Sequence, residues 1–196
     1  MSPILGARGG LAASAYGFTS AVAGPGDYES IQTVNVGAGG SSSASFTSIP
    51  STYKHLQIRG IARNTSAGTA SDYILLKFNS DTGANYAFHW LYGDGSAAGG
   101  TGSVNRSNLP VGTCWQSSAL ANSFSAVICD LLDYKDTNKF KTTRSLAGGD
   151  TNGGSYQEMN IMSGLWRNTN AITQIDISSS TGNLAQYSTF ALYGVK

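Results

Sequence analysis

The sequence predicts an all-β protein, a two-layer antiparallel β-sandwich of jelly-roll-like type with an extended N-terminal arm. Short runs of β-branched and aromatic residues recur along the chain, separated by clusters of Gly, Ser, Asn and Asp. No long segment places apolar residues at the 3.6-residue spacing of an amphipathic helix. Ten to twelve short strands at this spacing are typical of a sandwich.

The composition excludes several classes of protein. Charged residues make up 12% of the chain, and the formal net charge is +1. Without a basic stripe, nucleic acid is not an expected partner. No run reaches the ~20 apolar residues that cross a membrane, so membrane insertion is not expected. The N-terminus lacks the cationic start and apolar block of a secretory signal, and we expect folding in a cytoplasm.

Residues 1–27 differ from residues 28–196, and we predict them to be an attachment arm and a sandwich domain. The arm is rich in Ala, Gly and Ser and carries two charges, Arg8 and Asp27. It has too few large side chains for a core of its own, because ordering each residue costs ~1–2 kcal/mol of backbone entropy. A frayed terminus is one interpretation. The one we favour is a segment that orders on another subunit through Ile4, Leu5, Leu11, Tyr16 and Phe18.

The segment 72–95 predicts a β-hairpin. An apolar run at 73–78 is followed by turn formers at 79–83 and an aromatic-rich run at 86–92. Gly83 would take the positive-φ position. Because both runs are apolar at nearly every position, we expect this hairpin to be covered on both faces, in a sheet centre or at a subunit contact.

The other strands are predicted from alternation and turn clusters. In segment 54–63, Leu56, Ile58 and Ala62 share one face. The Gly-, Ser- and Asn-rich segment 96–109 is expected to be a surface loop, and 148–154 a turn. The remaining strands are expected at 28–36, 43–49, 112–116, 124–132, 139–147, 156–166, 172–177 and 186–195.

The strand at 124–132 is predicted to lie in the core. Ile128→Asp is therefore expected to cost several kcal/mol. Cys129 lies within this strand, and we expect it to be a small buried thiol rather than half of a disulfide with Cys114.

The sequence offers no catalytic or metal-binding pattern. Only His55 and His89 could act as a base, and neither lies near a nucleophile elbow. Two Cys and two His without CxxC or HxxxH spacing do not predict a zinc site. Carboxylate pairs such as Asp130 and Asp133 are more typical of strand ends than of hydrolysis. We expect no catalytic residue, no metal and no cofactor.

The aromatic residues allow two interpretations. Trp90, Tyr92, Trp115 and Trp166 could form a stacking face for glycans, or they could fill the core or a subunit interface. The second interpretation is favoured. Low charge and aromatic-rich strands also leave more apolar surface than one sandwich buries, so we expect an oligomer.

Five segments resemble the virion structural proteins of tailed bacteriophages, including cyanophages, a group often described as tail-fibre or structural proteins. They are SIPSTYKHLQIRGIARN (48–64), LLKFNSDTGANYAFHWLYGDGS (75–96), DLLDYKDTNKFKTTRSLAG (130–148), SGLWRNTNAITQIDI (163–177) and FALYGVK (190–196). The resemblance covers roughly residues 28–196. PILG (3–6) also looks like the start of the N-terminal attachment segment of a phage appendage.

The resemblance implies a non-enzymatic virion protein, assembled in the host cytoplasm. The favoured role is a short tail fibre or tail-appendage subunit, a homotrimer that docks by its arm on a tail adaptor or baseplate and contributes to host-surface attachment. Host surface glycan is a further partner under this role. One alternative is a capsid decoration or head-fibre protein that binds the major capsid protein and stabilises the head lattice. The other is a glycan-depolymerising tail protein, which the missing acid–base pattern disfavours.

Overall fold

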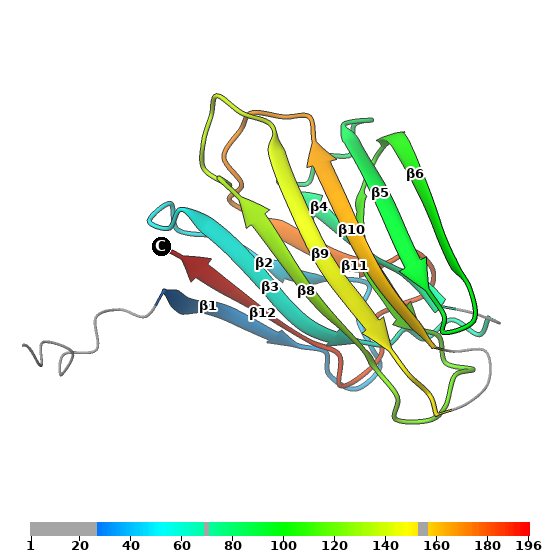
Figure 1. Ribbon diagram of the computed structural model, residues 1–196. Helices are drawn as coiled ribbons and strands as arrows, with labels where there is room; N and C mark the ends of the chain where they lie inside the picture. The colour runs from blue at the N-terminus through cyan, green and yellow to red at the C-terminus, as the bar shows by residue number, and fades with distance from the viewer. Residues whose placement is uncertain (1–26, 69–70, 153–156) are drawn as a thin grey trace, which may run out of the picture.

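The protein folds as two antiparallel β-sheets that face each other (Figure 1). The computed structural model describes residues 27–68, 71–152 and 157–196, and their twelve regular elements are all strands. The predicted two-layer antiparallel sandwich is therefore confirmed. Within these ranges, no helix is long and apolar enough to cross a membrane. The predicted arm contacts, Ile4, Leu5, Leu11, Tyr16 and Phe18, lie outside the described residues.

The larger sheet has eight strands in the order β1-β12-β3-β8-β9-β10-β5-β6. Tyr28 is paired with Val195, and the backbone N–H of Lys196 donates to the carbonyl of Asp27, so the two ends of the described chain lie side by side at the β1 edge. The strands are β1 (Tyr28–Asn35), β12 (Thr189–Val195), β3 (His55–Ala62), β8 (Ser125–Leu132), β9 (Lys141–Gly149), β10 (Glu158–Trp166), β5 (Tyr86–Gly93) and β6 (Ala98–Arg106).

The smaller sheet has four strands in the order β2-β11-β4-β7 and covers the inner face of the larger one. Its edge strand β7 packs against β8, β9 and β10 of the larger sheet. The strands are β2 (Ala44–Phe46), β11 (Ile175–Ser179), β4 (Ser71–Phe78) and β7 (Leu109–Trp115).

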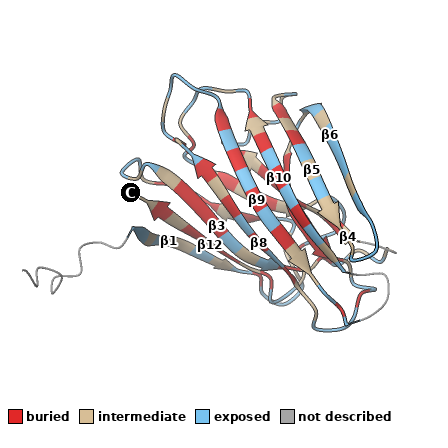
Figure 2. Cartoon of the chain, viewed as in Figure 1, coloured by how far each residue is buried: buried red, intermediate tan, exposed pale blue. Residues whose placement is uncertain are grey.

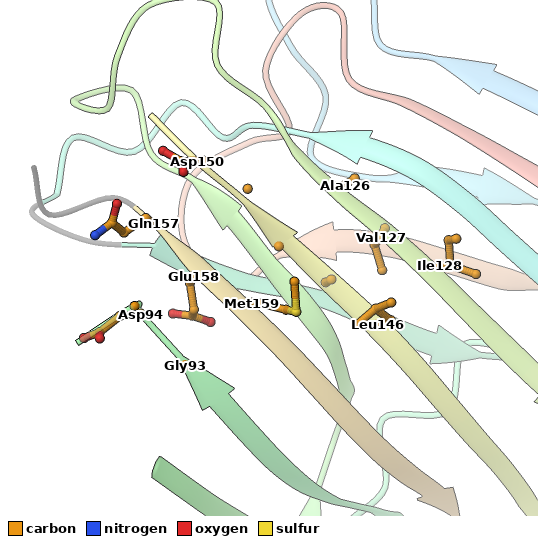
Figure 3. Close-up of a pocket in the computed structure, with 14 residues that line it drawn as sticks. Gly93, Asp94, Ala126, Val127, Ile128, Leu146, Asp150, Gln157, Glu158 and Met159 are labelled. Atoms are coloured by element: carbon orange, nitrogen blue, oxygen red, sulfur yellow. The ribbon is translucent and has the colours of Figure 1, made fainter. Parts of the chain in front are cut away.

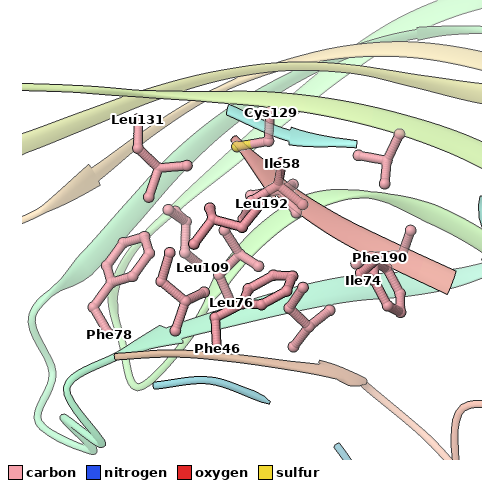
Figure 4. Packing of buried hydrophobic residues seen from close by; sticks show 14 of the residues in the cluster. Phe46, Ile58, Ile74, Leu76, Phe78, Leu109, Cys129, Leu131, Phe190 and Leu192 are labelled. Atoms are coloured by element: carbon pink, nitrogen blue, oxygen red, sulfur yellow. The ribbon is translucent and has the colours of Figure 1, made fainter. Parts of the chain in front are cut away.

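The core lies between the two sheets and is built by period-two alternation (Figure 4). In β3, Leu56, Ile58 and Ala62 are buried while Arg59 and Ile61 are exposed, as the alternation predicted. Large inward side chains from both sheets meet them, including Phe46, Leu76, Phe78, Leu131, Phe190 and Leu192.

The two cysteines are free and buried, which confirms the prediction for Cys129. Cys129 points inward from β8, and Cys114 lies on β7. Burial raises the pKa of the Cys114 thiol to about 12.

The segment 72–95 does not form a hairpin, and this prediction was wrong. β4 lies in the smaller sheet and β5 in the larger sheet, so the connection crosses from one layer to the other. Asn79 and Ser80, not Gly83, take positive φ values of 50° and 57°. The amide oxygen of Asn79 accepts the backbone N–H of Thr173 at 2.9 Å. A partner 94 residues away therefore fixes the turn, and the local sequence does not reveal it.

The segment 96–109 is mostly strand rather than loop. β6 spans Ala98–Arg106 and pairs with β5. A Cβ at Gly102 would lie 2.9 Å from the backbone carbonyl oxygen of Phe88, and one at Gly99 would require the side chain of Tyr92 to move. Composition indicated a loop, whereas the glycines make room for the large side chains of the neighbouring strand.

β8 is buried on one face only, and the prediction that Ile128 lies in the core was wrong. Figure 2 shows buried and exposed residues alternating along the middle strands of the larger sheet. Val127 is 2% exposed, whereas Ile128 is 43% exposed. Residues 126–129 are apolar at successive positions, so the outward Ala126 and Ile128 are apolar without being buried.

Candidate functional site

The outer face of the larger sheet carries an unusual number of exposed large apolar side chains. Leu91 and Met159 are each 66% exposed, and Ile161 is 54% exposed. In antiparallel sandwiches the outward positions of a strand are normally polar. Six such residues gather on five neighbouring strands: Ile61, Leu91, Ile128, Leu146, Met159 and Ile161.

Four of these residues form a continuous line across the sheet. Ile128 is paired with Leu146, Leu146 with Ile161, and Ile161 with Leu91. Residues that are directly opposite on neighbouring antiparallel strands project side by side on the same face. These four residues, on β8, β9, β10 and β5, are called the ridge row below.

The next line of outward positions is mostly small. Ala126 is paired with Gly148, and Met159 is paired with both Gly148 and Gly93. Ile61 extends the line on β3 through its pairing with Ala126. These five residues are called the hollow row, and the two rows together are called the apolar band.

The small residues of the hollow row produce a real depression. A hollow of about 560 Å³ lies over them, bounded by Ile128, Leu146 and Met159 (Figure 3). Gly148 cannot carry a side chain, because a Cβ there would lie 2.5 Å from the carbonyl oxygen of Glu158. The depth of this depression is therefore determined by the close backbone packing at Gly148 as well as by the size of the side chains.

Charged groups border the apolar band on both sides. Beyond the hollow row lie the exposed Asp150, which follows β9, and Asp94, which follows β5. Hydrogen bonds from the backbone N–H groups of Ala97 and Ser96 lower the pKa of Asp94. Beyond the ridge row, on β9, Arg144 has a side chain that is 74% exposed.

Arg144 is held only loosely within its own chain. Its guanidinium lies 3.5 Å from the carboxylate of Asp130 on β8. Asp130 also accepts a hydrogen bond from Gln57 Nε2 at 2.7 Å. Exposed pairs of this kind contribute ~0–1 kcal/mol, so Arg144 can contact another molecule at little cost.

The four aromatic residues singled out from the sequence do not form one surface. Trp166 is fully buried, and its indole N–H donates to Asp81 Oδ2 at 2.7 Å. Trp115 is 1% exposed and lies against Gly149. For these two, core filling is the interpretation that holds.

Trp90 and Tyr92 lie together on the inner side of β5. Their ring centroids are 4.8 Å apart, and Tyr73 of β4 packs edge-on against Trp90 at 5.4 Å. Both residues are half-buried, and the indole nitrogen of Trp90 has no hydrogen-bond partner among the described residues. A glycan or subunit contact at this pair remains a prediction.

The histidines are not brought together. His55 begins β3, and its Nδ1 accepts the backbone N–H of Asp133 at 2.9 Å. His89 is exposed on β5, with β8, β9 and β10 between the two strands. In the described ranges, no three His, Cys, Asp or Glu side chains are placed to hold a metal ion.

The sequence reasoning missed the apolar band. Its signal is present in the strands, because alternate positions 126 and 128 of β8, and 159 and 161 of β10, are apolar on the outward side as well as the inward one. Coverage on both faces is predicted for segment 72–95, and core burial for 124–132, without an exposed apolar face on either. No protein-family model, curated protein or solved structure matches the chain.

Proposed function

We propose that the protein is a non-enzymatic structural subunit of a tailed-phage particle, a short tail fibre or tail-appendage subunit that contributes to host-surface attachment. The observation that carries the proposal is the apolar band on the outer face of the larger sheet. Large contiguous apolar patches are uncommon on soluble monomers and mark surfaces that other proteins cover. A structural subunit needs such a surface, because contacts with other proteins hold it in the particle.

The fold separates two functions that an appendage subunit needs. The chain enters the sandwich at β1, which is one edge of the larger sheet. The ridge row begins three strands away on β8 and continues towards the opposite edge. Docking through residues 1–27 would therefore leave the apolar band available for another contact.

The resemblance to virion structural proteins supplies the phage assignment, and the particle itself supplies the test. Particles of the phage that encodes this chain should contain it in stoichiometric amount by quantitative mass spectrometry. A cryo-electron microscopy map should place the sandwich on the tail. Absence from purified particles would overturn the proposal, and density on the head lattice would replace the tail role with a decoration role.

Deletion of residues 2–24 tests the docking part of the proposal. The truncated chain should fold as the same sandwich and fail to enter particles. Normal incorporation would place the docking surface on the sandwich. Release of oligosaccharide from host polysaccharide by the purified chain would contradict the non-enzymatic role.

A further inference from the structure

We propose that the apolar band is a self-complementary interface for a second copy of this chain, packed sheet to sheet about a two-fold axis. The inference deepens the proposed function, since both require protein to cover the band, and it names the partner. Its basis is the match between the ridge row and the hollow row of the same face.

The symmetry follows from the register of the strands. The two-fold axis lies in the contact plane, is perpendicular to the strands and passes between the two rows. Rotation about this axis places each strand opposite the same strand of the second copy. The same axis exchanges the ridge row with the hollow row. A contact of this kind is isologous, because the same patch is used on both copies.

Under this operation, large residues face small ones on three strands. Leu146 of one copy faces the partner's Gly148, Ile128 faces the partner's Ala126, and Leu91 faces the partner's Gly93. The three large residues of each copy thus enter the hollow of the other. On β10, Ile161 faces the partner's Met159, whose unbranched side chain adapts to irregular gaps.

The charges on β9 agree with the same axis, while on β3 Arg59 of each copy faces the partner's Ile61. Arg144 and Asp150 lie on β9 and its continuation, three residues on either side of Ala147. The axis passes beside Ala147, so Arg144 of each copy faces the partner's Asp150. Two such ion pairs flank the apolar contact, and they oppose any register that slips along the strands.

The extent of the face sets the class of contact. Five strands spaced by about 4.8 Å and residue spacings of about 3.3 Å give a footprint of roughly 24 Å by 20 Å on each copy, about 1,000 Å² for the pair, which is the size of a weak or transient interface. A homotrimer would instead need two different surfaces that match each other. The observed match is within one surface and favours pairs.

The first experiment measures the mass of the purified full chain by sedimentation equilibrium over a concentration series. We expect a dimer, twice the 20.3 kDa chain mass. Leu146→Glu should give a monomer, because each substitution occurs twice in a symmetric interface. Leu120→Glu is the matched control, since Leu120 is also exposed, at 57%, but lies off the band, and it should leave the dimer unchanged.

A second variant separates shape matching from general stickiness. Ala126→Phe adds apolar area to the band but fills the hollow that the partner's Ile128 would enter. Overpacking of this kind should raise the dissociation constant at least about tenfold. Unchanged or tighter association would overturn the ridge-in-hollow geometry. Circular dichroism melts of each variant check that the sandwich remains folded.

A charge exchange tests the register. Arg144→Asp and Asp150→Arg should each weaken the dimer, and the double variant should recover most of the loss. No recovery, a monomeric or trimeric unmodified chain, or loss of the dimer on deletion of residues 2–24 would each contradict the inference. These outcomes concern the purified chain, whereas failure of the proposed function would appear as absence from particles.

Discussion

The two outer faces of this sandwich have the same position in the fold and opposite chemistry. On the smaller sheet, the outward positions of β2 and β11 are polar and paired: Ser45 Oγ donates to Asp176 Oδ1 at 2.7 Å, and Gln174 Nε2 donates to the same carboxylate at 3.0 Å. Lys77 lies across from Asp176 on β4. On the larger sheet, the corresponding outward positions form the apolar band.

β2 and β11 show that outward positions in this fold do not need apolar residues. The inward positions hold the sheets together, and the outward ones are free to vary in polarity. We therefore interpret the apolar outer face of the larger sheet as a surface for contact with another molecule and not as a requirement of folding. The following predictions test that separation.

The largest contrast is expected between neighbouring residues of β8. Val127→Asp places an unpaired carboxylate in the core and should lower the free energy of unfolding by ~3 kcal/mol or more. Ile128→Asp exposes its carboxylate to water and should change it by less than ~1 kcal/mol. Urea denaturation at low protein concentration, where association is minimal, gives both values. Equal losses would mean that the band is part of the folding core.

Making the polar outer face more apolar, or the apolar outer face more polar, should change the free energy of unfolding by a smaller amount. Asp176→Leu on the smaller sheet removes the acceptor for Ser45 and Gln174 and should cost ~1 kcal/mol. Leu146→Thr on the larger sheet should change monomer stability by at most ~0.5 kcal/mol while raising solubility. Thermal melts and ammonium sulfate solubility measure the two properties separately. A large loss of stability in Leu146→Thr would contradict the comparison.

The pH dependence of stability should reveal a half-buried carboxyl between the sheets. Burial raises the pKa of Glu158, and hydrogen bonds from Asn160 and Thr113 only partly oppose this. The folded state therefore binds more protons than the unfolded state above the ordinary pKa of 4.5. This contribution is fully present below that pH and is lost as the pH rises through the folded pKa.

Glu158→Gln removes this titration, so its melting temperature should vary less with pH than that of the unmodified chain between pH 4.5 and neutrality. Asp94→Asn is the control, because the pKa of Asp94 is lowered rather than raised. Parallel melting curves for Glu158→Gln and the unmodified chain would contradict the assignment.

Thiol labelling should perturb the stability of the protein least. It should also distinguish clearly between the inner and outer faces of the larger sheet. Burial raises the pKa values of Cys114 and Cys129, so neither should react with iodoacetamide in the folded state. A cysteine introduced by Ala126→Cys on the outer face should react rapidly at low protein concentration. Slow labelling at high concentration, where copies pair, would support coverage of the band. Rapid labelling of the native thiols would show that the core opens.

The sequence predicted burial correctly where the apolar residues of a strand mostly face the core. The alternation in β3 predicted which residues face the core, because polar residues occupy most of its outward positions. The alternation did not predict the exposure of Ile128, because β8 carries apolar residues on its outward face as well as on its core face. It failed for 72–95 because the turn depends on contacts with residues near Thr173.

The candidate surface can be recognised only when the pairing register of the larger sheet is known. Ile128, Leu146 and Ile161 are far apart in sequence, and only strand pairing places them in one row. The same is true of the small residues beside them. Glycines that suggested turns or loops, such as Gly148 and Gly102, lie instead in strands where neighbouring atoms leave no space for a Cβ.

The adjacency of the two ends of the described sandwich, Asp27 and Lys196, determines how it would bear mechanical load. Tyr28 and Val195 are paired at the end of the β1–β12 ladder, and the ammonium group of Lys196 contacts the carboxylate of Glu29. Pulling the two ends apart would open this ladder one pair at a time, starting from Tyr28. A load on the N-terminal segment that is resisted elsewhere in the sheet also passes through the β1–β12 ladder, because β1 is an edge strand and β12 is its neighbour in the sheet. A fibre subunit anchored at its N-terminus would therefore depend on this one ladder wherever in the sheet its other attachment lies.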